Sequence, residues 1–138
     1  MDLPRAINQV IAQDDVTWLR HYLDEGLTVD GVIYSLPLLM LASWYGAVKC
    51  VMFLLEHGAD RNEIYFSNTA MSEAVRGNKK GVVTILLRAN ATQKCSLYYK
   101  WAAKLFLAFE QDQRNLVRLA ASSFTVPPEV LELVKVRL

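Results

Sequence analysis

The sequence predicts an all-α fold, a solenoid of three to four helix–turn–helix repeats closed by a C-terminal capping helix. The first observation is a repeat, because RHYLDEGLTVD (20–30), MFLLEHGADRN (52–62) and TILLRANATQK (84–94) align without insertion. The aligned positions include Gly26, Gly58 and Asn90, and both 58 − 26 and 90 − 58 give 32 residues. The second observation is that each unit contains two apolar stripes at helical spacing, separated by a tight turn.

Each unit is expected to hold an inner and an outer helix. The inner stripes are Ile7, Val10 and Ile11, then Leu38, Leu39, Leu41 and Ala42, then Met71, Ala74 and Val75. The outer stripes are Val16, Leu19, Tyr22 and Leu23, then Val48, Val51, Phe53, Leu54 and Leu55, then Val82, Val83, Ile85, Leu86 and Leu87. Asp14 or Asp15 is placed to cap the first outer helix. Gly46 is expected to break the second inner helix.

The outer helices are expected to end at residues with positive φ. Glycine adopts this conformation freely and asparagine is the next most tolerant residue. Gly26, Gly58 and Asn90 occupy this position in the three units. We therefore expect repeats over about 3–34, 35–66 and 67–98.

The C-terminal part, residues 95–138, is expected to form a divergent fourth repeat and a capping helix. The segment LYYKWAAKLFLAF is apolar enough for an inner helix. After Pro127-Pro128, EVLELVKVRL carries an acidic residue in its first turn and basic residues at its end, as the helix dipole favours. A solenoid needs its terminal face covered, and this helix would cover it.

The segment PLLMLASWYGAVKCVMFLLEHGAD resembles an ankyrin repeat, with a small-residue inner helix, a glycine turn and an outer helix ending in LL before GAD. The resemblance extends over about residues 3–94. The TPLH signature of the family survives only as Pro37-Leu38-Leu39-Met40 and Thr69-Ala70-Met71-Ser72, and as Arg5-Ala6-Ile7-Asn8 in the first unit. In the family, the Thr and His of this signature usually form hydrogen bonds that tie neighbouring repeats together. Where these two residues are missing, those hydrogen bonds are not expected.

The composition indicates one small domain that has no strong electrostatic field. The chain has 138 residues, 53% of them hydrophobic, and a formal net charge of +1, so we expect no general attraction to nucleic acid or anionic membranes. Two cysteines and the lack of a secretory signal pattern favour reduced thiols and a cytoplasmic location. Residues 36–55 have the length of a membrane span, but Pro37, Gly46 and Lys49 favour a buried helix pair instead.

No catalytic motif is found. His21 and His57 stand apart, without Cys or His partners at zinc-ligand spacing, and there is no glycine-rich phosphate loop or nucleophile elbow. Helix ends explain Asp14-Asp15 and Asp24-Glu25, and Lys79-Lys80 are assigned to a turn. We therefore expect a protein that is not an enzyme and uses no cofactor or metal.

The candidate binding surface comes from the hairpin tips between repeats and from the ends of the inner helices, which the resemblance places on the concave face of an ankyrin array. Several of these positions carry aromatic side chains, which are enriched at binding hot spots. The predicted partner-binding residues are Tyr34, Trp44, Tyr45, Tyr65, Phe66, Asn68, Arg76 and Phe109. The alternative is that the hairpins fold back and bury some of these rings.

Two functions remain open on the sequence. The resemblance implies an adaptor or inhibitor that binds a protein partner, with no nucleic acid, membrane or small-molecule substrate. The alternative is a substrate receptor of a ubiquitin ligase, because VPPEVLELV (126–134) resembles the start of an F-box and, with SLYYKWAAKL (96–105), a SOCS box. Whether the C-terminal helix packs on the fourth repeat or exposes its apolar stripe would discriminate the two.

Overall fold

A computed structural model describes residues 3–92, 94, 99–100 and 102–104. Its helices are α1 (Leu3–Ala12), α2 (Val16–Asp24), α3 (Leu38–Tyr45), α4 (Val48–Glu56), α5 (Ala70–Arg76) and α6 (Lys80–Arg88). Short turns join α1 to α2, α3 to α4 and α5 to α6, which makes each couple an antiparallel pair. The predicted helix–turn–helix units are thus present over residues 3–88.

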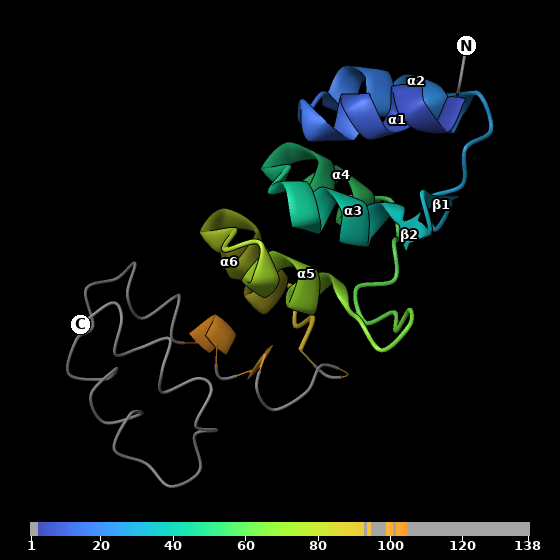
Figure 1. Ribbon diagram of the computed structural model, residues 1–138. Coiled ribbons are helices and arrows are strands. Elements are labelled where there is room, and N and C mark those ends of the chain that lie inside the picture. Colours follow the sequence, from blue (N-terminus) through green and yellow to red (C-terminus); the bar gives the residue numbers. More distant parts are fainter. Residues whose placement is uncertain (1–2, 93, 95–98, 101, 105–138) are drawn as a thin grey trace, which may run out of the picture.

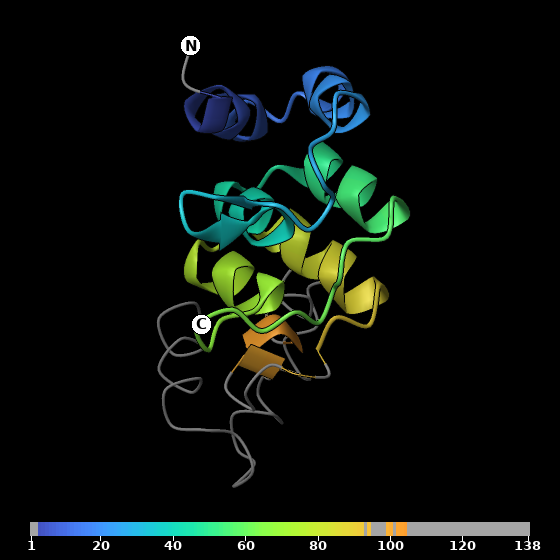
Figure 2. The ribbon, with the colours of Figure 1, turned by 90° about the vertical axis from the view of Figure 1, so that its right-hand side faces the viewer.

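The three helix pairs stack in one direction (Figure 1). Turned by 90°, the molecule shows α1, α3 and α5 stacked as one layer on the left and α2, α4 and α6 stacked as a second layer beside it on the right (Figure 2). The central inner helix, α3, lies between α1 and α5, and its residues from Leu38 to Ser43 are all buried. A helix that is apolar all round belongs in the interior, which explains the long apolar run of the second unit.

The backbone repeats with the same 32-residue register as the sequence. Among the described residues, positive φ occurs only at four places in the unit: Asp14, Gly46 and Asn78; Gly26, Gly58 and Asn90; Tyr34 and Phe66; Ser35 and Ser67. The first group ends the inner helices and the second ends the outer helices. The predicted left-handed stops at Gly26, Gly58 and Asn90 are confirmed, with φ of 115°, 87° and 59°.

In the described part of the chain, the structure departs from a purely helical fold between consecutive helix pairs. Strands β1 (Val32–Ile33) and β2 (Leu36–Pro37) form a short antiparallel hairpin between the first and second helix pairs. The same place in the next unit has a single bridge between Tyr65 and Asn68. The fold is therefore mostly helical, and the expected limit between residues 34 and 35 falls inside the hairpin turn.

The apolar segment 36–55 is divided into β2, α3 and α4 by the turn at Gly46, which has φ of 72°. Across the described residues, none of the helices has both the length and the apolar character that crossing a membrane requires. Residues 99–100 and 102–104 are helical, and Ala102 and Ala103 are buried. The rest of the predicted fourth repeat and the predicted capping helix lie outside the described residues.

Candidate partner-binding surface

The hairpin tips are built from turns that hold two residues at positive φ. In the first, Val32 pairs with Pro37 and Ile33 with Leu36, and the central residues Tyr34 and Ser35 have φ of 51° and 63°. In the second, the amides of Tyr65 and Asn68 donate to each other's carbonyls at 2.9 and 3.0 Å, around Phe66 and Ser67 with φ of 48° and 64°. Turns with positive φ at both central residues strongly prefer Asn-Gly or Asp-Gly.

Both aromatic residues of these turns point into solvent. The side chain of Tyr34 is 54% exposed and that of Phe66 is 80% exposed. Neither ring is therefore held in place by core packing. Tyr65 is partly buried against the core, as the alternative of folded-back hairpins expected, and it meets the edge of Phe66 at 4.7 Å between ring centroids. Its ring supports the tip and offers less contact area than expected.

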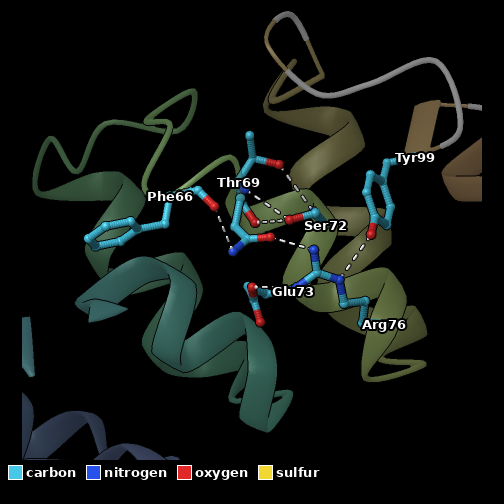
Figure 3. A network of polar contacts seen from close by, with 7 residues as sticks. Phe66, Thr69, Ser72, Glu73, Arg76 and Tyr99 are labelled. Carbon is cyan, nitrogen blue, oxygen red and sulfur yellow. Dashed lines mark hydrogen bonds and ion pairs between the residues drawn. The ribbon is translucent and has the colours of Figure 1, made fainter. Parts of the chain in front are cut away.

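Arg76 links the end of α5 to the second hairpin (Figure 3). Its Nε donates to the hydroxyl of Tyr99 at 2.9 Å, its Nη1 pairs with Glu73 Oε1 at 3.3 Å, and its Nη2 donates to Asn68 Oδ1. The guanidinium also lies over the Tyr99 ring, 5.7 Å from its centroid. Three partners therefore fix the guanidinium, although the Arg76 side chain remains 44% exposed.

Glu73 is the buried member of this network. Only 6% of the residue is exposed. Burial raises the pKa of its carboxyl group above the usual value, and the charge of Arg76 opposes that shift in part. Asn68 in turn donates from Nδ2 to the carbonyl of Phe66 at 3.2 Å. The network therefore runs from a buried carboxylate on α5 to the backbone of an exposed aromatic turn (Figure 3).

Trp44 and Tyr45 end α3, away from the hairpin that begins it. The helix has eight residues, so Trp44 and Tyr45 lie about 12 Å along its axis from the hairpin that precedes it. Trp44 is 44% exposed, whereas the Tyr45 hydroxyl donates to Asn8 Oδ1 of α1 at 3.0 Å. Gly77 approaches the Trp44 carbonyl closely, since a Cβ built on it would lie 3.1 Å from that oxygen. The ends of α3 and α5 are therefore neighbours, and Arg76, the last residue of α5, bonds Asn68 of the second hairpin.

Residues 37–64, which comprise α3, α4 and the loop toward the second tip, match the ankyrin repeat family model. The chain contains an ankyrin repeat. Searches among curated proteins and among solved structures gave no match. The expected resemblance is confirmed at the unit where the signature is fullest.

The ankyrin repeat is bonded to its neighbours by contacts other than those of the family signature. On the upstream side, the Tyr45 hydroxyl bonds Asn8, and the Asp60 amide donates to Asp30 Oδ1 at 3.1 Å. On the downstream side, Arg61 Nη1 donates to the Ala89 carbonyl at 2.8 Å. Where the signature has lost Thr and His, the repeats are therefore linked through side chains of other helix and loop positions.

Thr69 retains one function of the signature position. Its hydroxyl oxygen accepts from the Ser72 amide at 3.1 Å, and the Ser72 hydroxyl oxygen accepts from the Thr69 amide at 2.9 Å (Figure 3). This reciprocal cap satisfies two amides at the start of α5. It fixes where α5 begins and hence where Asn68 lies relative to Arg76.

Reactive side chains of the ankyrin repeat are occupied or buried. Cys50 is fully buried, and burial, then the Asp14 hydrogen bond and the charges of Asp14 and Asp15, raise its pKa to about 12. A neutral thiol is a poor nucleophile. His57 stacks on Phe53 at 4.0 Å and its Nδ1 bonds the Phe53 carbonyl at 2.8 Å. Within the described ranges, no group of three or more His, Cys, Asp or Glu is placed to hold a metal ion.

Two members of the site were not predicted, and one predicted member cannot be placed. Glu73 has a sequence signal, because it is an acidic residue inside the apolar stripe of Met71, Ala74 and Val75. Tyr99 has none beyond its place near the next tip. Phe109 lies outside the described residues, as do the segments that resemble an F-box and most of the one that resembles a SOCS box.

Proposed function

We propose that this chain is a non-enzymatic interaction module, an adaptor or inhibitor that binds one protein partner. In this proposal three to four ankyrin repeats form a solenoid closed by the C-terminal helix. The partner lies across the hairpin tips and the ends of the inner helices, and the complex forms in the cytoplasm. The ligand is a protein rather than nucleic acid, membrane or a small molecule. Ankyrin repeats build extended binding surfaces of this kind.

The observation that carries the proposal is the pair of exposed aromatic residues at positive φ. A left-handed conformation costs a residue with a Cβ about 1–2 kcal/mol. Tyr34 and Phe66 occupy equivalent turns with φ of 51° and 48°, and their rings are mostly exposed. Core packing therefore does not offset this cost. Strain that is kept at an exposed position is typical of functional sites.

Arg76 supports the same surface. Arginine and aromatic residues dominate binding hot spots, and rigid side chains lose less entropy on binding. The Arg76 guanidinium is already fixed by Asn68, Glu73 and Tyr99. Among the described residues, these three partners engage three of its five N–H groups, and in this proposal the other two donate to an acceptor on the partner.

The test is a comparison of proteins retained from an extract of the source cells by the full chain and two variants. Tyr34→Asn with Phe66→Asn removes both rings and suits the turn conformation. The matched control, Met52→Asn, removes an apolar side chain that is 46% exposed on α4. We expect one protein to be retained by the wild type and the control and to fall at least tenfold with the double variant. Once this retained protein is purified, its Kd for the double variant should likewise be at least tenfold higher than its Kd for the wild type.

Equal retention by all three forms would contradict the assignment of the hairpin tips. Loss of retention with Met52→Asn as well would place the binding surface on the outer helices instead. Circular dichroism and urea unfolding of each form show whether the variants are folded, so that a loss of binding is not mistaken for unfolding.

A further inference from the structure

The outer face of the first helix pair is a second apolar surface, separate from the hairpin tips. A hollow of about 360 Å³ lies between α1 and α2, lined by Ala6, Gln9, Val10 and Gln13 on one side and by Trp18 and Tyr22 on the other, with Asp15 at its end. Trp18 is 52% exposed there. In the described part of the chain no element lies on this face, which is the free end of the stack in Figure 1.

The repeat register shows what this face is built to do. Val10, Trp18 and Tyr22 are equivalent to Ala42, Cys50 and Leu54 in the second pair and to Ala74, Val82 and Leu86 in the third. All six of the later residues are fully buried. The Cys50 amide donates to Asp14 Oδ1 of the preceding pair at 2.9 Å. The first pair therefore presents apolar side chains at positions that a stacked neighbour buries in the other pairs.

A terminal repeat that ends a solenoid carries a polar outer face. Here the large rings of Trp18 and Tyr22 stand at outer-helix positions that are fully buried in the second and third pairs. Because the face continues the stacking interface of the array, the surface that fits it is another amphipathic helix pair.

The polar groups around the hollow favour a second copy of the same face. Gln9 and Gln13 are exposed, and an amide carries both donors and an acceptor, so it can pair with its own copy. Asp15 is the one charged residue of the lining, and its Oδ1 already accepts from the Trp18 amide at 3.2 Å. Two such faces can therefore meet without strong like-charge repulsion.

We propose that two copies of this chain associate through their α1–α2 faces about a two-fold axis. An isologous interface needs a patch that is complementary to itself. Trp18 projects beside the hollow, so the indole of each copy can fill the hollow of the other. The helices are only ten and nine residues long, which places the contact among the smaller interfaces.

The test is sedimentation equilibrium of the full chain over a wide range of concentration. Trp18→Glu should weaken self-association at least tenfold, because it removes the ring and buries a charge. Gln13→Arg keeps the rings and brings like charges together across the axis, so it should weaken association without touching the core. Met52→Glu, an equally exposed apolar residue on α4, is the matched control and should behave as the wild type.

A wild type that stays monomeric at the highest concentrations would overturn the proposal. So would a dimer that neither Trp18→Glu nor Gln13→Arg weakens, because that dimer would use another surface. Tyr34→Asn with Phe66→Asn should leave self-association unchanged. If these tip variants weaken it, the exposed aromatic turns form the dimer contact and the end face does not.

Discussion

The Cys50 amide donates a hydrogen bond of 2.9 Å to Oδ1 of Asp14, which lies in the turn of the preceding helix pair. The Lys49 amide donates to Oδ2 of the same carboxylate at 3.2 Å. Both amides belong to the first turn of α4, where the N-cap residue is Ala47 and has no side-chain oxygen. Asp14 therefore caps a helix of the next pair, and it does so from a left-handed conformation with φ of 55°.

Asp14→Gly should lower the free energy of unfolding by about 1 kcal/mol, because glycine tolerates the turn but supplies no cap. Asp14→Ala should cost about 1 kcal/mol more, because alanine adds left-handed strain. Urea unfolding of the two variants separates the cap from the turn. Equal stability of the wild type and Asp14→Gly would mean that the carboxylate contributes nothing to stacking.

These contacts mark the limit of what the sequence can predict about the fold. The 32-residue register predicted the left-handed stops, because glycine and asparagine are specific to that conformation. It offered Asp14 or Asp15 as the cap of the first outer helix; Asp15 takes that role, with its carboxylate accepting from Trp18. The role of Asp14 depends on how pairs stack, which joins residues 35 and 36 positions apart.

The candidate site was predictable in position and less so in orientation. The register placed the tips, but Tyr65 and Phe66 are neighbours, and only the turn conformation decides which ring packs on the core. The apolar outer face of the first helix pair, in contrast, could not be predicted from the sequence at all. Val10 and Tyr22 fit an ordinary buried stripe, and only the three-dimensional stack shows that their side of the first pair has no preceding neighbour within the described chain.

Glu73→Gln should raise the free energy of unfolding at pH 7. Burial raises the pKa of the Glu73 carboxyl group above 4.5, so the folded protein binds the proton more tightly than the unfolded chain does. The free energy of unfolding then falls as the pH rises from 4.5 through the raised pKa of Glu73, because ionisation of the buried carboxyl group is unfavourable. The glutamine side chain avoids this cost and can still accept from Arg76.

The gain from Glu73→Gln should disappear below about pH 4.5, where the wild-type carboxyl group is protonated too. Urea unfolding at pH 7 and pH 4 measures both differences. Glu25→Gln, which removes the same charge from an exposed residue after α2, is the matched control for the loss of one carboxylate. A loss of stability at pH 7 in Glu73→Gln would show that the Arg76 ion pair outweighs the cost of burial.

Phe66→Asn should raise the free energy of unfolding by about 0.5–1 kcal/mol, because asparagine tolerates the left-handed conformation better than phenylalanine does. Little packing is lost, since the ring is mostly exposed. The matched comparison is Phe66→Ala, which removes the ring and keeps the strain, so it should not stabilise the protein. Identical melting temperatures for the two variants would show that left-handed strain at residue 66 does not affect the stability of the protein.

Trp44→Ala and Tyr45→Phe should separate binding from stability at the end of α3. The Tyr45 hydroxyl donates to Asn8 Oδ1 on α1 and so links the first two helix pairs. Tyr45→Phe should therefore lower the free energy of unfolding by about 1 kcal/mol and leave partner affinity unchanged. Asn8→Ala should have a similar effect, and the two changes together should cost less than their sum, as expected for one shared bond.

Trp44→Ala removes an exposed ring and opens no core cavity. Stability should change by less than about 0.5 kcal/mol, while partner affinity should fall at least tenfold if this ring is a hot spot, equivalent to about 1.4 kcal/mol or more. Lys49→Ala, exposed on the outer helix α4, is the control and should leave affinity unchanged. Unaltered affinity in Trp44→Ala, with the loss confined to the tip variants, would restrict the binding surface to the hairpins, about 12 Å away along α3.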